Sequence, residues 1–321
     1  MSSLIEQAAK RLAQLRQAGV DIPEGAPAAE EASGAGGTAA PDTAGEPTIH
    51  RAAAEIQSRA AEPESPAPAR AGGGRSKLVE LDLEAIAATG LVTPQAPGSQ
   101  IAEQYRVIKR PLLVNALGKG GVPPIENGNL IMVTSALPNE GKTFNAVNLA
   151  MSIVAELDCT VMLVDADVAR PSVLQLLGLS PERGLLDLLQ DDTLDFADVL
   201  LRTNVEKLSI LPSGTPHPRA TELLASDAMV KLINDIANKY RDRIIIFDSP
   251  PLLVTTESQA LASHMGQIVV VVEAERTLQS EVMQALAAIE SCPVKHVILN
   301  KAKADFKKGY SYGYGYAYRY G

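Results

Sequence analysis

The sequence predicts an α/β fold in which a mostly parallel sheet carries helices on both faces, preceded by a disordered N-terminal region. Three observations support this prediction. From about residue 100, short apolar segments alternate with amphipathic ones, as strands alternate with helices in such folds. Several apolar segments are nearly continuous, which is typical of strands buried on both faces. Residues 23–75, in contrast, contain only two large aliphatic side chains, Ile49 and Ile56.

Composition divides the 321 residues into five parts. An amphipathic helix is expected within residues 1–20, either as a docking helix for a partner or as a transient helix with no role. Residues 21–76 are rich in Ala, Pro and Gly and are expected to be a disordered linker, because they cannot bury enough apolar area to fold. Residues 77–99 form a short, partly ordered segment that packs either on the domain or on a partner. The folded domain is expected at 100–302, and a flexible tyrosine-rich tail at 303–321.

Four of the six expected strands of the domain end in a polar residue: Ser135, Asp165, Asp248 and Asn300. The strands are predicted at Leu130–Ser135, Thr160–Asp165, Leu208–Leu211, Ile244–Asp248, Ile268–Val272 and His296–Asn300. Helices between them are predicted at Phe144–Leu157, Asp227–Tyr240 and Ser280–Ile289. Because ligands of such folds bind at the carboxyl ends of the strands, the functional site is expected at this edge of the sheet.

Charge and composition exclude several classes of protein. The net charge is −9, so no basic surface is expected for a nucleic acid. Two cysteines are too few for a disulfide framework. The sequence has no run of 18 apolar residues and no apolar signal-peptide core near its N-terminus. A cytoplasmic protein is therefore expected.

The strongest motif lies between a predicted strand and a predicted helix, at residues 131–143. Its context is that of a phosphate-binding loop, in which backbone N–H groups and a helix N-terminus hold the β- and γ-phosphates. Lys142 would place a positive charge on the phosphates, and Thr143 would offer its hydroxyl to Mg²⁺. Ala136 replaces the first glycine of the common pattern, so the match is to a variant. The alternative is an ordinary strand–turn–helix. The expected nucleotide-binding residues here are Pro138, Asn139, Glu140, Gly141, Lys142, Thr143 and Phe144.

Two further motifs place aspartates at strand ends. Asp165 and Asp167 follow one apolar strand, and both could reach a Mg²⁺–nucleotide cluster, or one could accept a proton from an attacking hydroxyl. The alternative for Asp167 is a helix cap or turn. Asp248 ends another strand, before two prolines, and is expected to position Mg²⁺. The three motifs in this order indicate a P-loop NTPase fold.

Asn300 ends the last predicted strand. Its amide would either contact the edge of a nucleobase or form an Asx turn.

The C-terminal tail is the most unusual segment. Six of the eight tyrosines lie at alternate positions among the last twelve residues, separated by small residues and one arginine: Tyr310, Tyr312, Tyr314, Tyr316, Tyr318 and Tyr320. Such a segment has no helical stripe to bury. It presents phenol hydroxyls that another active site could reach, so we expect these six tyrosines to be phosphate acceptors.

Taken together, residues 100–321 resemble the bacterial tyrosine kinases known as BY-kinases. The phosphate loop, Asp165-Ala166-Asp167, Ile244–Pro251, Leu211–Gly214 with Glu222–Leu224, and the tyrosine tail all have counterparts in that family. The segment from Ile101 to Arg110 resembles the family's Glu-x-x-Arg-x-x-Arg helix, which mediates assembly into a ring; the matching residues are Glu103, Arg106, Lys109 and Arg110. The N-terminal layout and residues 77–94 resemble the exosortase-associated autokinases of exopolysaccharide systems.

The resemblance implies a P-loop tyrosine autokinase that uses ATP and Mg²⁺. Lys142, Asp165 and Asp167 would be catalytic, Thr143, Asp167 and Asp248 would hold the metal, and Arg170 would contact the nucleotide. The implied partners are other copies of the chain in a ring, a membrane chain-length or polysaccharide co-polymerase protein as activator, and a cognate tyrosine phosphatase. The activator would recruit the chain to the inner face of the membrane.

Five positions depart from the family pattern. Ala169 stands where an arginine is usual, with Arg170 next to it, and Asn139 stands where glycine is common. Arg219 and Ala220 replace a frequent Asn-Pro pair. Lys109 at the third position of the assembly helix lacks the bidentate pairing of arginine.

Two rival functions remain open at this point. A partitioning or division-site ATPase of the same fold would carry a lysine five residues before Lys142, where this chain has Leu137, and would lack the tail. A nucleotide-binding scaffold without phosphotransfer would use the tail for aromatic contacts only.

Overall fold

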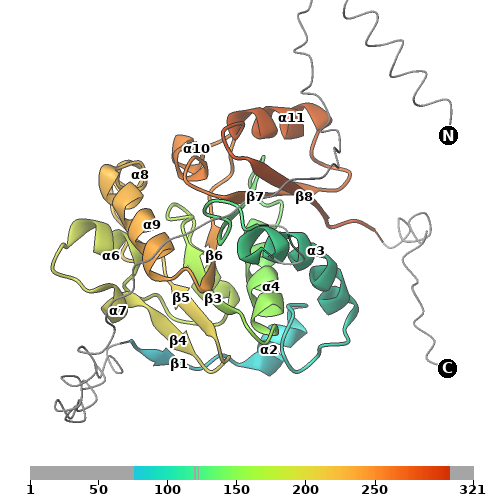
Figure 1. Cartoon of the computed structure of the whole chain (residues 1–321), viewed down its shortest axis with the longest axis horizontal. Helices are drawn as coiled ribbons and strands as arrows, with labels where there is room; N and C mark the ends of the chain where they lie inside the picture. Colours follow the sequence, from blue (N-terminus) through green and yellow to red (C-terminus); the bar gives the residue numbers. More distant parts are fainter. Residues whose placement is uncertain (1–75, 119–120, 122, 304–321) are drawn as a thin grey trace, which may run out of the picture. The chain divides into compact units, whose positions relative to one another are not determined.

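The computed structural model describes residues 76–118, 121 and 123–303, and this part of the chain contains one eight-stranded sheet (Figure 1). Its strand order is β1-β4-β5-β3-β6-β2-β7-β8, and every neighbouring pair is parallel except β4 and β5. The strands are β1 (Leu78–Val79), β2 (Leu130–Ser135), β3 (Thr160–Asp165), β4 (Leu201–Thr203), β5 (Leu208–Leu211), β6 (Arg243–Asp248), β7 (Gln267–Glu273) and β8 (Val294–Asn300). All six predicted strands are confirmed, and the predicted mostly parallel sheet with them. The predictions for residues 1–75 and for the tail after residue 303 lie outside the described residues.

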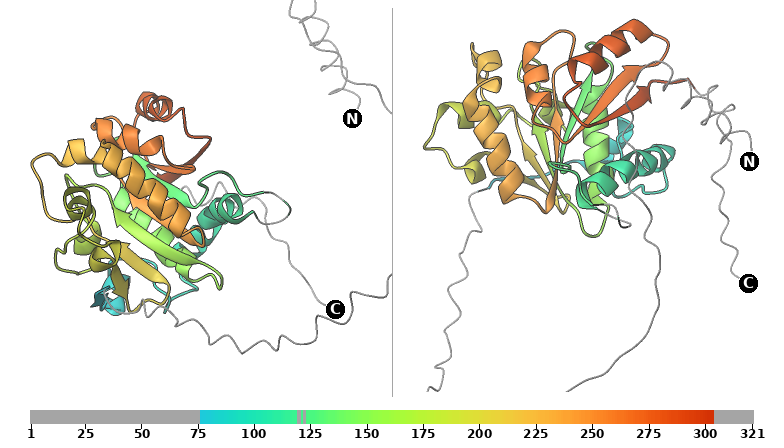
Figure 2. Two further views of the ribbon diagram at one scale, coloured as in Figure 1. Left: turned by 60° about the vertical axis from the view of Figure 1, so that its left-hand side comes forward. Right: turned by 45° about the horizontal axis from the view of Figure 1, so that its top comes forward.

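Helices cover both faces of the sheet, as predicted (Figure 2). One face carries α2 (Leu83–Ala88), α3 (Gln100–Leu117), α4 (Lys142–Val154) and α5 (Val173–Leu176). The other carries α6 (Leu185–Gln190), α7 (Phe196–Val199), α8 (Ala220–Leu224), α9 (Asp227–Lys239), α10 (Thr256–Ala262) and α11 (Gln279–Ala288). Within the described residues, no helix combines the length and apolar character needed to cross a membrane.

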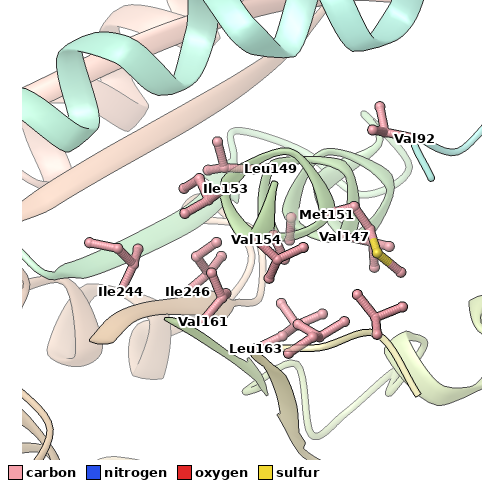
Figure 3. Close-up of a cluster of buried hydrophobic side chains, with 14 of the residues drawn as sticks. Val92, Val147, Leu149, Met151, Ile153, Val154, Val161, Leu163, Ile244 and Ile246 are labelled. Atoms are coloured by element: carbon pink, nitrogen blue, oxygen red, sulfur yellow. The ribbon is translucent and has the colours of Figure 1, made fainter. Parts of the chain in front are cut away.

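Successive side chains of each central strand point alternately into two separate hydrophobic cores, one on each face of the sheet. In β2, Ile131 and Val133 join the core under α4, whereas Leu130 and Met132 join the core on the opposite face. Helix α4 is buried along almost its whole length, and Figure 3 shows its apolar side chains facing those of β3 and β6. Two-sided burial explains why the central strands are continuously apolar, and it fixes the position of the loop that joins β2 to α4.

Residues 77–99 belong to the domain. Strand β1 pairs with β4, and five apolar side chains of this segment are buried in the core under α4: Val79, Leu81, Ile86, Leu91 and Val92. The backbone N–H of Val92 also donates to Asn148 Oδ1 of α4 at 2.6 Å. Of the two alternatives for this segment, the structure shows packing on the domain, which therefore includes residues 77–99.

The burial of this segment has a measurable consequence. Ile86 is 3% exposed, so Ile86→Ala should lower the free energy of unfolding by about 2–4 kcal/mol, the usual cost of a large-to-small substitution in a core. Leu78, eight residues earlier and 67% exposed, provides the matched control: Leu78→Ala should cost less than about 0.5 kcal/mol. Urea unfolding of the three proteins measures both changes. Equal losses in the two variants would contradict the packing of this segment.

The carboxyl ends of the central strands meet at one edge of the sheet. Asp165 at the end of β3 lies directly opposite Asp248 at the end of β6, and Val133 near the end of β2 is the other partner of Asp248. On the other side of β2, Glu273 of β7 lies opposite Asn300 of β8. The sheet therefore gathers the polar strand-end residues around the end of β2.

Candidate functional site

The loop between β2 and α4 has the backbone of an anion-binding turn. Helix α4 begins at Lys142, directly after Gly141, whose φ is +99°. Asn139 also has a positive φ, +67°, which asparagine tolerates better than most residues. The departure from glycine at this position therefore leaves the left-handed turn in place. The N-terminus of the 13-residue helix α4 follows this turn directly, and the first N–H groups of a helix have no acceptor within it.

Glu140 closes this loop from inside the protein. Its buried carboxylate accepts hydrogen bonds from the Leu137 N–H at 2.6 Å and from the Thr277 hydroxyl. Ser135 Oγ donates to the Leu137 carbonyl at 2.6 Å. The side chain of Glu140 is thus directed into the protein, where it fixes the loop. Its predicted contact with a nucleotide has no support from this orientation.

The end of β8 holds the same loop from the other side. Asn300 Nδ2 donates to the Glu140 carbonyl at 2.8 Å, and Lys301 Nζ donates to the Asn139 carbonyl at 2.7 Å. A Cβ atom at Gly141 would lie 2.2 Å from Asn300 Nδ2, so this approach requires glycine. The amide of Asn300 positions the phosphate loop in this structure, and contact with a nucleobase stays a prediction.

Three carboxylates lie beside the start of α4. Thr143 Oγ1 donates to Asp248 Oδ2 at 2.6 Å, and Lys142 Nζ forms an ion pair with Asp167 Oδ2 at 3.3 Å. Asp165 Oδ2 accepts the backbone N–H groups of Ser172 and Val173 at 3.1 and 3.0 Å. The short segment after β3 is therefore folded back onto Asp165, which brings Asp167 to the lysine of the phosphate loop.

The electrostatics of this cluster favour a cation. Asp165 and Asp248 are 1% and 0% exposed, and the Oδ1 atom of each is buried without a hydrogen-bond partner. Burial, with the charge of Asp248 as the next cause, raises the pKa of Asp165 to about 8. Burial also raises the pKa of Asp248 to about 7, against the opposing hydrogen bond from Thr143. One lysine does not balance three buried carboxylates, so the donors present suit a hard divalent ion such as Mg²⁺.

These side chains do not form a metal site on their own. Among the described residues, no group of three or more His, Cys, Asp or Glu side chains is arranged to hold a metal ion. Mg²⁺ in proteins is commonly bound by one or two carboxylates together with substrate phosphates and water. The arrangement therefore fits a metal that arrives with a polyphosphate.

A cavity of about 510 Å³ opens in front of the loop and α4, and we call it the nucleotide cavity. Most of the predicted nucleotide-binding residues line it: Pro138, Asn139, Gly141, Lys142, Thr143, Phe144, Asp167 and Arg170. Ala169 and Arg170 both line it, so the arginine displaced by one position in the sequence still reaches the same space. Glu140, Asp165, Asp248 and Asn300 lie outside this lining.

Sequence reasoning missed two parts of the cavity wall. Ser172 lines it, and its Oγ lies 2.7 Å from Thr143 Oγ1. Val254 and Thr255, in the loop after β6, also line it, and Val254 is 58% exposed. The only sequence feature that could have indicated Ser172 as a cavity residue is its position just after the second aspartate motif. Val254 carried none, because an exposed valine in a loop has no chemical signature.

Helix α3 contains the four residues predicted to mediate assembly, and they differ in exposure. Glu103 and Arg110 are exposed, and Arg106 is partly exposed and forms an ion pair with Glu103. Lys109 is only 4% exposed: its Nζ donates to the Ser152 carbonyl at 2.5 Å and pairs with Glu156 at 2.7 Å. Lys109 must therefore be removed from the predicted contact surface, because it ties α3 to the end of α4.

The two tyrosines before the tail are poor acceptors in the folded domain. Tyr105 is 4% exposed and its hydroxyl donates to Asn145 Oδ1 at 2.7 Å. Tyr240 packs its ring against Phe196 and under the guanidinium of Arg243. The six predicted acceptors, at 310–320, lie outside the described residues.

Comparison with known proteins gives consistent results. A family model described as an AAA domain matches residues 130–301, more than half of the chain. The tyrosine-protein kinase YwqD of Bacillus subtilis is 31% identical over 199 residues, which cover 62% of this chain and 79% of that protein. The succinoglycan biosynthesis transport protein ExoP of Rhizobium meliloti is 33% identical over 226 residues, 68% of this chain but 27% of that protein. Among solved structures, the kinase domain of the Escherichia coli tyrosine kinase ETK matches with a TM-score of 0.54 and 25% identity, over 69% of this chain and 85% of that domain.

Proposed function

Because the chain belongs to the bacterial tyrosine-protein kinases, we propose that it uses ATP to phosphorylate the tyrosines of its own C-terminal tail, supplied by a neighbouring copy. The chain is thus a P-loop protein-tyrosine kinase. The observation that carries the proposal is the nucleotide cavity, where Lys142, Thr143 and Asp167 converge in a chain that ends in six alternating tyrosines. One sequence thus contains both a site suited to phosphoryl transfer and six tyrosines that could accept the phosphoryl group.

ATP binding is proposed at the loop of residues 138–143. The N–H groups at the start of α4 and the helix dipole bind the β- and γ-phosphates. Lys142 then exchanges its ion pair with Asp167 for the phosphate oxygens, a movement its long side chain permits. Arg170, at the rim of the same cavity, adds a second positive charge in place of the arginine missing at Ala169.

The metal would be held by Thr143, Asp167 and Asp248, together with phosphate oxygens and water. When bound, Mg²⁺ neutralises charge on the β- and γ-phosphates and aligns them for transfer. The Thr143 hydroxyl already contacts Asp248 at 2.6 Å, so both oxygens face the same small volume. This placement also gives a role to the buried Oδ1 atom of Asp248, which has no hydrogen-bond partner.

Transfer requires a phenol oxygen, a proton acceptor and a balanced charge. The tyrosine oxygen forms a bond to the γ-phosphorus, the bond to the β–γ bridging oxygen breaks, and ADP leaves with that electron pair. Lys142 balances the charge that moves onto the bridging oxygen. We assign acceptance of the phenol proton to Asp165, whose Oδ1 has no hydrogen-bond partner.

The regulatory part of the proposal concerns assembly and partners. Three charged residues of α3, the exposed Glu103 and Arg110 and the partly exposed Arg106, are available for contacts between copies in a ring. Similarity to a transport protein of succinoglycan biosynthesis supports a role in exopolysaccharide polymerisation and export. We place the chain beside a membrane chain-length protein that activates it and recruits it to the inner face of the membrane, opposed by a tyrosine phosphatase.

Two rival functions meet specific objections. A partitioning or division-type ATPase would need a lysine where Leu137 stands, and here Leu137 is partly buried against the core beneath α9 and α10. A nucleotide-binding scaffold would leave the cluster around Asp165 and Asp167 without a chemical role. The following experiment separates the scaffold from the kinase.

Phosphorylation between copies can be tested with two full-length variants. The donor carries phenylalanine at all six tail positions, and the acceptor is Lys142→Met with its tail intact. With Mg²⁺–ATP, the mixture should accumulate phosphotyrosine on the acceptor at a rate that rises with donor concentration, whereas each variant alone should stay unlabelled. Mass-spectrometric mapping identifies the modified tyrosines. An unlabelled acceptor beside a wild-type chain that labels itself would indicate phosphorylation within one copy, and an unlabelled wild type would support the scaffold.

Phosphorylation should also act as an assembly switch. Each phosphotyrosine adds nearly two negative charges at neutral pH, so a tail with several of them should be repelled from a neighbour whose site contains three carboxylates. Sedimentation of wild type before and after treatment with Mg²⁺–ATP should show a shift to smaller species after phosphorylation, and phosphatase treatment should reverse it. Identical mass distributions would exclude the switch.

A further inference from the structure

The two edges of the sheet differ in how they are protected. At one edge, β1 has only two residues, and so short a strand offers little backbone for another strand to pair with. At the other edge, β8 has seven residues (Figure 1), and no strand within the described residues pairs with its outer side. Folded proteins shorten, charge or cover such an edge, because its free N–H and C=O groups pair readily with other segments.

The outer side of β8 presents both free backbone groups and apolar side chains. The Asn300 carbonyl accepts the Ala274 N–H at 2.9 Å, so the backbone groups of Asn300 point toward the β7 side. Because this direction alternates along a strand, the N–H and C=O groups of Val297 and Leu299 point outward. The side chains of these two residues are 54% and 53% exposed. They lie on the face that carries α11, opposite Ile298, which packs against the core under α4.

The one lysine of β8 does not protect this side of the strand. Lys295 lies on the same face as Val297, where a free ammonium group would discourage pairing. Its Nζ instead donates to the carbonyls of Glu290 and Cys292, at 3.3 and 2.6 Å. The charge is therefore held at the end of α11, and the edge of β8 is neither short nor charged.

We propose that the chain's own tail, residues 310–320, folds back and pairs with the outer side of β8 as an added antiparallel strand. After β8 ends at Asn300, Lys303 is held by an ion pair with Glu275. Residues 304–309 can then span up to about 20 Å, whereas an added strand lies only about 4.8 Å from its neighbour. So short a connection gives the tail an effective concentration on the order of millimolar, which favours it over the tail of another copy.

The alternation of the tail matches the two faces of β8. In an extended strand, its six tyrosines lie on one face, and its serine, glycines, alanine and arginine lie on the other. With the tyrosines on the α11 face, their rings cover the exposed Val297 and Leu299, and cross-strand pairs of aromatic and β-branched residues are favourable. The small residues then lie beside Ile298, which is already packed against the core. A slip by one residue would exchange the two faces, so burial of the rings fixes the register.

Hydrogen exchange of single amides, measured by NMR on the full-length chain without nucleotide, tests this docking. In wild type, the Val297 and Leu299 amides should exchange about tenfold or more slowly than in a variant with serine at all six tail tyrosines. A variant with phenylalanine at these positions keeps the rings and should exchange as wild type does. The amides of His296 and Ile298 point toward β7 and should be slow in all three proteins, which provides a control within the same strand.

The outcome depends on which segment covers the edge. Exchange of the Val297 and Leu299 amides that is equal in wild type and in the serine variant would overturn the proposal. Protection by the chain's own tail should also be independent of concentration, which mass spectrometry can follow from about 100 to about 1 µM. Protection that disappears on dilution would show that another copy covers β8, and the assignment to the chain's own tail would be wrong.

A substitution on β8 itself gives a second, independent test. In full-length Val297→Lys, a charge stands on the outer side of the strand, so the Leu299 amide should lose its protection, whereas Val297→Ile should keep it. Retained protection in Val297→Lys would contradict pairing at this edge.

The effect of docking on phosphorylation rests on the proposed kinase function. A tail held on β8 is withheld from a neighbour's site, so Val297→Lys should accept phosphate on its tail about twofold or more faster than Val297→Ile. Equal rates would contradict this withholding. A chain that gains no phosphotyrosine would refute the kinase function, and slow exchange of the Val297 and Leu299 amides in that chain would still support the docking.

Discussion

Substitution of Lys142 by methionine should lower the rate of tail phosphorylation by about a thousandfold or more. Lys142 is the only lysine among the residues that line the nucleotide cavity, and its Nζ lies 3.3 Å from Asp167. Methionine keeps most of the apolar stem of lysine, so the buried stretch of the side chain at the start of α4 stays filled. What is lost is the charge that stabilises the transferred phosphoryl group.

The control for this change is Lys231→Met, on the exposed side of α9. That variant should label its tail at the wild-type rate, which separates a specific loss from a general effect of removing a lysine. Circular dichroism should show the same helix content in all three proteins. Tail labelling at the wild-type rate in Lys142→Met would refute the proposed role of the phosphate loop.

The long strands could be predicted from the sequence because their environment leaves a local signal. A strand buried on both faces must be apolar through its middle, and β2, β3 and β7 each contain at least four consecutive apolar residues, with polar residues only at their ends. Strands β1 and β4 have two and three residues, too few for any periodicity, and β1 exists through its pairing with β4, more than 120 residues away. Pairing between short segments that lie far apart in the sequence produces no local pattern from which these strands could be predicted.

The candidate site likewise contains residues that could be predicted from the sequence and side-chain directions that could not. The lining residues of the phosphate loop, from Pro138 to Phe144, follow from a motif, because their spacing is imposed by the turn into α4. The direction of Glu140 and the burial of Lys109 do not follow from any motif, since each is decided by a partner far along the chain: Thr277 for the first and Ser152 for the second. A charged residue at a motif position is thus predictable as a type, but the side to which it points depends on tertiary packing.

Asp248→Asn should make the metal-free protein more stable at neutral pH and at the same time abolish tail phosphorylation. The carboxylate of Asp248 is fully buried, its Oδ1 has no partner, and its pKa is raised from 3.8 to about 7. A carboxyl group whose pKa is raised by folding binds protons more strongly in the folded state. Its ionisation therefore removes stability progressively as the pH rises from about 4 to about 7. Asparagine keeps the acceptor for the Thr143 hydroxyl and carries no charge to bury.

The expected gain at pH 8, measured by urea unfolding in the presence of a chelator, is about 1–3 kcal/mol, the range for an unsatisfied buried polar group. Below about pH 4 the carboxyl of Asp248 is largely protonated in both the folded and the unfolded wild type, so the difference between the two proteins should nearly vanish. Asp235→Asn, at an exposed position of α9, should change neither value and serves as the control.

Mg²⁺–ATP should then stabilise wild type more than Asp248→Asn, because the carboxylate that destabilises the empty site is the one proposed to hold the metal. A variant that is less stable than wild type by the same amount at both pH values would mean that Asp248 is a structural residue of the core, and the metal assignment would fail with it.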